Sequence, residues 1–313
     1  MLQPIIKVEH LSHKYSVQWA IRDINFEIAE NGVTGLLGSN GAGKSTTMNI
    51  ICGVLNQTAG QVFLNGIDLA KEPVRAKQNI GFLPQKPPLY GDLTVDEYLT
   101  YAADLRLMDK QAVKPAVEHA KERCGIAHFS KRLIRNLSGG YQQRVGIAQS
   151  IIHNPKFVVL DEPTNGLDPN QIVEIRELIK EIGKDRSVLL STHILPEVQV
   201  TCNYIKMIEN GQLVFSGTSE QFNNYLEPER FTVTLLNPPP AEELHAIPGV
   251  IEIESNQEGH YRIRFAGNKN ITKEVVELSV ARNWELTEIA LEKSSLDEVF
   301  SFLSKQSQQS TEA

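Results

Sequence analysis

Short apolar runs alternate with amphipathic stretches along most of the chain. Residues 33–38 (VTGLLG), 157–163 (FVVLDEP) and 187–193 (SVLLSTH) each contain the uninterrupted apolar run of a strand that is buried on both faces. Residues 46–55 and 172–183 instead have apolar positions at helical spacing. This alternation of strands and helices predicts an α/β layered domain, in which ligands bind at the carboxyl ends of the strands.

Two further patterns predict smaller subdomains beside this core. Residues 20–28 (AIRDINFEI) alternate apolar and polar side chains, as a half-exposed strand does, and residues 60–69 predict a hairpin around an Asn-Gly pair. Residues 93–122 and 136–154 have a helical pattern. We therefore expect an antiparallel β subdomain and a helical subdomain.

The pattern changes around residues 227–240, where the proline-rich LNPPP cannot continue a helix or a central strand. The order that follows is strand, helix, strand, strand, helix, strand, which predicts a small α+β domain of the ferredoxin-like type. An amphipathic helix over 295–304 ends it. We predict a first domain over residues 1–226, a small C-terminal domain over 227–304, and a disordered polar tail over 305–313.

Composition excludes several classes of protein. The formal net charge of −7 argues against a nucleic-acid partner, since phosphate neutralisation needs an excess of Lys and Arg. The three cysteines, Cys52, Cys124 and Cys202, are far apart, which is typical of reduced thiols in the cytosol. The chain has no run of about 20 mostly apolar residues. If it works at a membrane, another chain must supply the membrane part.

Residues 38–46 (GSNGAGKST) fit the phosphate-binding pattern G-x-x-x-x-G-K-[ST], with Gly38, Gly43, Lys44 and Ser45 at the fixed positions. A strand precedes the segment and a helix follows it, so backbone N–H groups gather at a helix N-terminus and form an anion site. Lys44 would reach the β- and γ-phosphates of ATP, and the Ser45 hydroxyl would ligate Mg²⁺. The nucleotide is expected to contact the segment along its length: Ser39, Asn40, Gly41, Ala42, Gly43, Lys44, Ser45 and Thr46.

Polar residues at the strand ends supply the remaining chemistry. Asp161 and Glu162 end one buried strand, so Asp161 would take Mg²⁺ and Glu162 would orient or deprotonate the attacking water. His193 ends the next strand and would hydrogen-bond the γ-phosphate. Gln85 follows a short strand and would touch Mg²⁺ or the water. Tyr15 is the preferred platform for adenine stacking, with Trp19 as the competing candidate.

A second anion site is predicted at residues 137–144 (LSGGYQQR). Ser138, Gly139 and Gly140 precede an apolar-faced helix, so their N–H groups and the Ser138 hydroxyl can hold an anion. The stretch contains no lysine and no acid. It is therefore half of a site, which needs groups from elsewhere to act on a phosphate.

Together these motifs resemble the ATP-binding cassette ATPases, the nucleotide-binding subunits of ABC transporters. The resemblance covers residues 1 to about 225 and implies a P-loop NTPase fold with a RecA-like core. The matching segments are GSNGAGKST for Walker A, Gln85 for the Q-loop, LSGGY for the signature, FVVLDE for Walker B, GLDP (166–169) for the D-loop, and His193 for the switch histidine. Tyr141 stands where the signature of the family usually has Gln.

The family resemblance implies what the second anion site is for. Two cassettes pack head to tail, as a homodimer or a heterodimer, and the Walker A of one and the signature of the other hold the same ATP. Asp168 would lie at the seam between them.

The sequence of residues 166–183 and 191–198 resembles that of a narrower branch of this family, the gliding-motility, sodium-exporter and antibiotic-exporter cassettes of bacteria. That branch implies a separate transmembrane permease, export, and a peripheral position on the cytoplasmic face of the inner membrane. Residues 89–105 are where the family docks the permease.

Other readings are weaker. Translation-associated relatives carry two cassettes in one chain, and DNA-repair relatives insert a long coiled coil, whereas this chain has one cassette and no sustained heptads. A GTPase would carry an NKxD motif, which is missing here. An ATP-driven switch without a membrane partner remains as the alternative.

Overall fold

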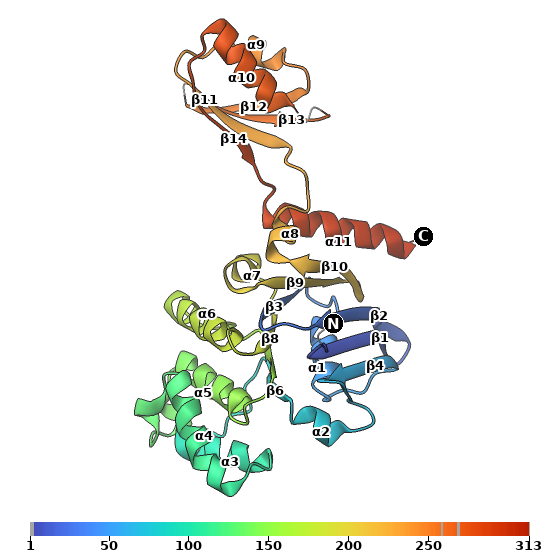
Figure 1. Ribbon diagram of the computed structural model, residues 1–313, viewed down its shortest axis with the longest axis vertical. Helices are drawn as coiled ribbons and strands as arrows, with labels where there is room; N and C mark the ends of the chain where they lie inside the picture. The colour runs from blue at the N-terminus through green and yellow to red at the C-terminus, as the bar shows by residue number, and fades with distance from the viewer. Residues whose placement is uncertain (1–2, 258, 268–269, 313) are drawn as a thin grey trace. The chain divides into compact units, whose positions relative to one another are not determined.

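The computed structural model describes residues 3–257, 259–267 and 270–312 (Figure 1). The chain packs into two compact units: the first holds the residues up to Ser219 and those from Leu303 onward, and the second is Glu220–Phe302. The domain boundaries predicted at residues 226 and 304 lie near this division and stay predictions. None of the helices in the described part of the chain is both long and apolar enough to cross a lipid bilayer.

The central sheet of the first unit has the strand order β10-β9-β3-β8-β7-β6. All its neighbouring pairs are parallel except β9 and β10. Every residue of β7 and β8 is buried, as the uninterrupted apolar runs predict. Its strands are β3 (Gly32–Leu37), β6 (Ile80–Leu83), β7 (Phe157–Asp161), β8 (Ser187–Ser191), β9 (Tyr204–Glu209) and β10 (Gln212–Thr218).

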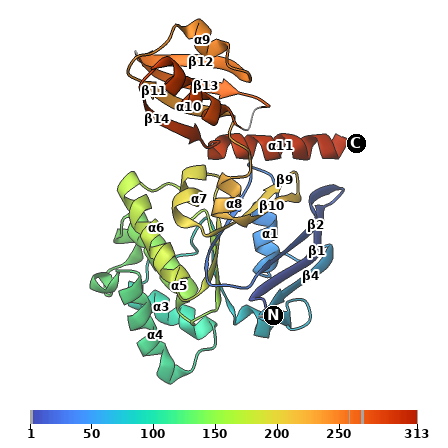
Figure 2. The ribbon, with the colours of Figure 1, turned by 45° about the horizontal axis from the view of Figure 1, so that its top comes forward.

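A second, antiparallel sheet has the order β2-β1-β4-β5. The Asn65-Gly66 turn joins its last two strands, and both turn residues have positive φ, 51° and 78°, as a two-residue hairpin requires. Helix α1 lies between the two sheets, and one hydrophobic core contains residues of all three (Figure 2). The strands are β1 (Ile6–Tyr15), β2 (Gln18–Ile28), β4 (Ala59–Leu64) and β5 (Ile67–Asp68).

Helices complete the first unit and include the predicted helical subdomain. There the stretch predicted as helical from residue 93 to 122 forms two helices, α3 and α4, because Leu107 between them has a positive φ of 56°. The α-helices are α1 (Lys44–Ile51), α2 (Pro73–Lys77), α3 (Val95–Leu105), α4 (Lys110–Arg123), α5 (Gly139–Ile151), α6 (Pro169–Gly183) and α7 (Leu195–Thr201). Two 3₁₀ turns are Ala127–Phe129 and Ile134–Asn136.

A buried lysine fastens α3 to α4. Lys121 is 1 % exposed, and its ammonium donates to Asp96 at 2.6 Å, to Glu118 at 2.9 Å and to the Ser130 hydroxyl at 2.8 Å. The charge is thus fully hydrogen-bonded, which a buried ammonium needs in order to remain charged.

His153, which follows α5, makes the first unit sensitive to acid. Its Nε2 donates to the Ile80 carbonyl at 3.0 Å, while its buried Nδ1 has no partner among the described residues. Burial lowers the pKa of His153 to about 4, and the positive charge of Arg106 adds to the effect. Because the unfolded chain takes up this proton near pH 6.5, the neutral imidazole's contribution is complete above pH 6.5 and is lost as pH falls towards 4.

We therefore expect His153→Gln to flatten the acid side of the stability curve. In the native protein, His153 lowers the free energy of unfolding by up to about 1.4 kcal/mol per pH unit as the pH falls. Thermal melts of both proteins between pH 7 and 5 measure this, with the exposed His128→Gln as the control. A slope that is unchanged in His153→Gln would contradict the assignment.

The second unit is a four-stranded antiparallel sheet of order β12-β13-β11-β14 with two helices. Its elements follow in the order strand, helix, strand, strand, helix, strand, which is the order predicted from the sequence. They are β11 (Arg230–Leu235), α9 (Ala241–His245), β12 (Val250–Gln257), β13 (His260–Phe265), α10 (Ile271–Arg282) and β14 (Leu286–Glu292). Its core contains Phe231, Ile263 and Trp284.

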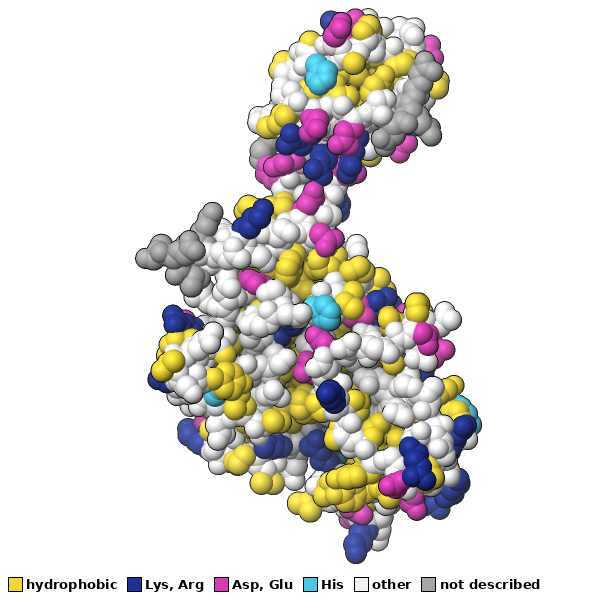
Figure 3. Space-filling model, turned by 180° about the vertical axis from the view of Figure 1, so that it is seen from behind, with side chains coloured by type: hydrophobic (Ala, Val, Ile, Leu, Met, Phe, Trp, Pro, Cys, Tyr) yellow, Lys and Arg dark blue, Asp and Glu magenta, His cyan; other side chains and the backbone are white. Residues whose placement is uncertain are grey.

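Charged side chains of the second unit pair with one another. Arg262 contacts Glu292 at 2.6 Å, and Arg264 contacts Glu252 at 3.0 Å. In the space-filling view, Lys and Arg side chains stand among Asp and Glu side chains on this unit (Figure 3). Such mutual pairing is typical of a solvated face, and these residues carry no catalytic constellation.

The prediction of a disordered tail over residues 305–313 is wrong for residues 305–312, and residue 313 lies outside the described residues. Two helices border the second unit, α8 (Ser219–Asn223) and α11 (Leu296–Glu312), so residues 305–312 continue α11. Leu303 and Ser307 lie one helical turn apart and are 1 % and 5 % exposed. The polar composition of the segment conceals this buried face, because Ser307 is small and its hydroxyl finds partners inside the first unit.

Candidate active site

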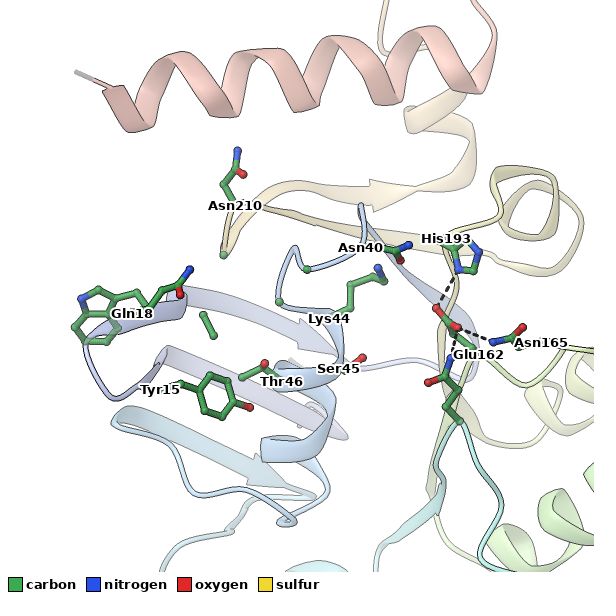
Figure 4. Close-up of a pocket in the computed structure, with 16 residues that line it drawn as sticks. Tyr15, Gln18, Asn40, Lys44, Ser45, Thr46, Glu162, Asn165, His193 and Asn210 are labelled. Carbon is green, nitrogen blue, oxygen red and sulfur yellow. Dashed lines mark hydrogen bonds and ion pairs between the residues drawn. The ribbon is translucent and has the colours of Figure 1, made fainter.

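A cleft of about 810 Å³ lies over the start of α1 and the carboxyl ends of the central strands (Figure 4). It brings together most of the residues predicted to bind nucleotide and Mg²⁺. Those that line it are Tyr15, Asn40, Gly41, Gly43, Lys44, Ser45, Thr46, Gln85, Glu162 and His193. Residues that sequence reasoning missed also line it: Gln18, Ala20, Asn165, Asn210 and Gly211.

The phosphate loop has a conformation that needs glycine. Gly43 has φ 110°, and a Cβ there would lie 2.5 Å from Ile21 Cγ2 and 2.9 Å from the Ala20 carbonyl oxygen. Gly43 is also the residue before α1, and no described side chain caps that helix. The first N–H groups of α1 are therefore available to an anion.

Lys44 is buried in the cleft, 6 % exposed. Its ammonium donates to the carbonyl oxygens of Gly38 and Ser39, both at 2.8 Å. Burial lowers the pKa of Lys44, and the nearby carboxylates of Glu162, Glu209 and Asp161 oppose this shift. Neutral carbonyls are weaker partners for an ammonium than phosphate oxygens are, so the arrangement suits a polyphosphate.

Asp161 and Glu162, at the end of β7, share a common support. The buried Ser191 hydroxyl donates to Asp161 Oδ1 at 2.5 Å and accepts from the Glu162 backbone N–H at 3.1 Å. Burial raises the pKa of Asp161, the bond from Ser191 opposes the shift, and the Glu162 charge adds to it. Asp161 is 8 % exposed and lies behind the cleft lining rather than in it.

The Glu162 carboxylate is held from three sides. Gln85 Nε2 donates to it at 2.7 Å, His193 Nδ1 at 2.9 Å and Asn165 Nδ2 at 3.3 Å (Figure 4). Glu162 itself has a left-handed backbone, with φ 46°, which costs of order 1–3 kcal/mol and is typical of functional positions. Asn165 is the contact that the sequence did not suggest, and its position three residues after Glu162 is the only local signal for it.

The two aromatic candidates differ in their surroundings. Trp19 is 37 % exposed, and the cationic groups of Lys14 and Arg22 lie 5.5 Å and 5.4 Å from its ring centroid. Tyr15 is 52 % exposed and packs edge-on against His13 at 4.6 Å. The ring of Tyr15 is therefore freer to stack on a base.

The remaining predicted residues lie outside the cleft lining. Ser39 and Ala42 belong to the phosphate loop but face other groups: Ser39 donates to Glu209, and Ala42 is 3 % exposed. The Asp168 carboxylate caps α6 by accepting from the N–H groups of Asn170 and Gln171, at 3.1 and 3.0 Å.

The signature residues are exposed at the start of α5, away from this cleft. Ser138 and Gly139 are exposed, and Gly140 is covered by Gln171, whose Cδ would lie 2.8 Å from a Cβ at Gly140. Tyr141, the departure from the family signature, packs against Phe129 with the ring centroids 4.6 Å apart.

The donor set suits Mg²⁺ that arrives with a nucleotide. Ser45, Asp161 and Gln85 offer hydroxyl, carboxylate and amide oxygens, which are the ligands that Mg²⁺ prefers. The described residues contain no group of three or more His, Cys, Asp or Glu that could hold a metal alone. Mg²⁺ typically combines one or two protein carboxylates with substrate phosphates, so a site of this kind needs no protein cage.

A glycine-rich loop before a helix, with two acids at the end of a parallel strand of the same sheet, defines a P-loop nucleotide-binding protein. The family model described as "ABC transporter" matches residues 21–165. A model described as "AAA domain, putative AbiEii toxin, Type IV TA system" matches residues 131–200. Both describe P-loop ATPase domains, and the chain shares this ATPase class.

Named relatives extend the match. The bacitracin transport ATP-binding protein BcrA of Bacillus licheniformis is 34% identical over 232 residues, 72% of this chain and 75% of BcrA. The ABC transporter ATP-binding protein NatA of Bacillus subtilis (strain 168) is 34% identical over 209 residues, 66% of this chain and 85% of NatA. YxlF of the same strain, named an uncharacterized ABC transporter ATP-binding protein, is 32% identical over 231 residues, 74% of this chain and 77% of YxlF.

Solved structures agree with these relatives. CbiO1 of Clostridium perfringens, described as part of the ABC transporter complex cbiONQ, is 30% identical with a TM-score of 0.64, over 70% of this chain and 90% of that chain. The chain belongs to the ATP-binding proteins of ABC transporters. The resemblance drawn from its motifs is thereby confirmed.

Proposed function

We propose that the chain binds Mg-ATP in this cleft and hydrolyses its γ-phosphate, as the ATP-binding subunit of a bacterial exporter. One observation carries the proposal: the Glu162 carboxylate is fixed by Gln85, His193 and Asn165 beside the cleft into which Lys44 also points. A carboxylate so placed can orient and deprotonate a water in line with the phosphate that Lys44 holds.

Each residue of the cleft has a role that follows from its position. The N–H groups of the loop from Asn40 to Thr46 cradle the phosphates. The Lys44 ammonium has a third N–H beyond its bonds to the Gly38 and Ser39 carbonyls, and this N–H donates to phosphate oxygens. Gln85 donates to Glu162 through its amide nitrogen, which leaves its amide oxygen available as a ligand. When Mg²⁺ is bound, Ser45, Asp161 and Gln85 would hold it, and its charge stabilises the negative charge on the phosphates. His193 supports Glu162 and can reach the γ-phosphate.

For the adenine we predict that Tyr15 is the platform. Tyr15→Ala should raise the KM for ATP about tenfold, since stacking on a base contributes about 1–3 kcal/mol. Trp19→Ala is the matched control and should change KM less, because two cations already lie over the Trp19 ring. Steady-state ATPase kinetics measure both. A larger effect of Trp19→Ala would reverse the assignment.

The exposed signature supports a dimer as the working form. Ser138 and Gly139 lie outside the cleft of their own chain, yet they offer N–H groups at the start of α5. In a head-to-tail homodimer or heterodimer they would meet the γ-phosphate bound by the partner. Asp168 would lie near the same seam, where it also keeps α6 capped.

A groove next to Gln85 supports a separate transmembrane permease as the partner. It is about 480 Å³ in volume and is lined by Leu89, Tyr90, Gly91, Asp92, Leu93 and Tyr101. It begins four residues after the Gln85 that holds Glu162, so an occupant could influence the catalytic carboxylate. The names of BcrA and of the lantibiotic relative SrtF refer to transport of antibiotics, which supports export. The chain would then sit peripherally on the cytoplasmic face of the inner membrane.

Affinity purification of the tagged chain from detergent-solubilised native membranes, followed by mass spectrometry, tests this part. A stoichiometric polytopic membrane protein is the expected result. ATP hydrolysis by the chain with no membrane protein recovered would favour the soluble switch instead.

A further inference from the structure

The end of β9 and the turn that follows it contact the phosphate loop at three points. A Cβ on Gly38, at the start of the loop, would lie 2.1 Å from the Ile208 carbonyl oxygen, so the loop is pressed against the end of β9. Further along, the Gly211 N–H donates to the Ala42 carbonyl at 3.0 Å. Between these two contacts lies Glu209.

Glu209 makes the strongest of these contacts. Its carboxylate accepts the Ser39 N–H at 3.1 Å and the Ser39 hydroxyl at 2.5 Å. Glu209 is only 5 % exposed, and bonds to a buried carboxylate are roughly twice as strong as bonds between neutral groups. The first peptide of the phosphate loop is therefore fixed in orientation.

The same peptide and the next one hold Lys44, because the carbonyl of the first peptide, that of Gly38, accepts from the Lys44 ammonium at 2.8 Å. The Ser39 carbonyl accepts from the Lys44 ammonium at 2.8 Å. Glu209 therefore binds the N–H and the hydroxyl of Ser39, while Lys44 binds its carbonyl oxygen. The Glu209 charge also opposes the effect of burial on the pKa of Lys44. Glu209 thus acts on both the direction and the charge of the lysine, although it contributes nothing to the cleft lining.

From the other side, α11 fixes the backbone that carries Glu209. The Ser307 hydroxyl accepts from Asn210 Nδ2 at 3.2 Å and donates to the Glu209 carbonyl at 3.4 Å. The turn is therefore held between a buried serine and the phosphate loop.

We propose that Glu209 is a positioning residue for nucleotide binding, which fixes Ser39 and through it places the ammonium of Lys44 for the β- and γ-phosphates. This inference rests on the proposed function, since it assumes that the cleft binds ATP. It adds a residue that the P-loop pattern does not contain.

Glu209→Ala removes both bonds to Ser39 and should raise the Kd for Mg-ATP about tenfold, the effect of losing hydrogen bonds to a charged group. Glu209→Gln loses the charge but can still bond to Ser39, whose hydroxyl both donates and accepts, so it should recover most of the affinity. A double-mutant cycle of Glu209→Ala with Ser39→Ala should be non-additive, because the two side chains share one contact. Titration calorimetry with Mg-ATP gives the four constants of the cycle and that of Glu209→Gln.

Asp96→Asn is the control for a general loss of stability. It removes the charge of one hydrogen-bond partner of buried Lys121, far from the cleft, so it should lower the Tm and leave the Kd for Mg-ATP unchanged.

The inference is wrong if Glu209→Ala leaves the Kd unchanged, if Asp96→Asn raises the Kd equally, or if the cycle is additive. If Glu209→Ala does not fold, Ser39→Ala decides: it removes the hydroxyl bond to Glu209 and should raise the Kd for Mg-ATP several-fold, and an unchanged Kd contradicts the inference. A native chain that binds no Mg-ATP would contradict the proposed function as well, whereas tight native binding with unchanged variants contradicts this inference alone.

Discussion

Glu162→Gln should lower kcat for ATP hydrolysis about a thousandfold, within the range that a general base contributes, while the affinity for Mg-ATP stays close to native. Glutamine has the shape of glutamate and can still accept from Gln85 and Asn165 through its amide oxygen, so the cleft keeps its geometry. What it loses is the basic carboxylate that takes the proton from water. Single-turnover hydrolysis and calorimetric binding measure the two quantities separately.

Because ATP would bind without being consumed, the same variant should accumulate as an ATP-bound dimer. Size-exclusion chromatography at saturating Mg-ATP detects it. Glu30→Gln is the matched control: Glu30 lies outside the cleft, and its carboxylate accepts from the Tyr204 hydroxyl at 2.5 Å. A fall in kcat of less than tenfold would remove Glu162 as the general base, and a strictly monomeric Glu162→Gln at saturating Mg-ATP would contradict the ATP-driven dimer.

Gly139→Asp should abolish hydrolysis without disturbing either the fold or the cleft. Gly139 is exposed, its φ is not positive, and a Cβ there meets nothing closer than Leu167 Cδ2 at 3.8 Å. An aspartate in the first turn of α5 even favours the helix, by about 0.3–1 kcal/mol through its dipole. In the proposed dimer, however, the new carboxylate would repel the partner's γ-phosphate, and we expect kcat to fall at least about a hundredfold.

Mixing inactive variants turns this into a test of geometry. Lys44→Ala destroys the phosphate loop, and Gly139→Asp destroys the signature. In a head-to-tail dimer of one chain of each, one of the two sites combines the intact loop of the Gly139→Asp chain with the intact signature of the Lys44→Ala chain. Activity should therefore reappear on mixing. Gln111→Asp, an acid in the exposed first turn of α4, is the control and should hydrolyse ATP like the native chain; a mixture that stays inactive would contradict the shared site.

Local patterns determined much of the fold and of the nucleotide loop. The apolar runs at β3, β7 and β8 predict buried parallel strands because a strand covered on both faces has no polar side to show. The Gly-rich loop is equally local, since its chemistry depends on backbone N–H groups and glycine geometry within a few residues. Glu162, His193 and Gln85 were found because they follow strands, and parallel strands end at one edge of a sheet.

The sequence predicted neither the helical tail nor the break between α3 and α4. In the tail, Ser307 is buried by contacts with Glu209 and Asn210, which lie about a hundred residues away in the chain. No periodicity within a polar stretch records such partners. For the adenine platform, the sequence already favours Tyr15 over Trp19, and the two cations beside the Trp19 ring add a structural reason.

The sequence by itself determined that this protein has a P-loop cassette, because the motifs that bind phosphate and activate water are short and contiguous. Only the tertiary structure decided which side chains hold those motifs in place. Ser191 under both acids and Glu209 on Ser39 are contacts between separate segments. Their energy comes from burial and from hydrogen-bond geometry, and both are properties of the packed chain rather than of any stretch of its sequence.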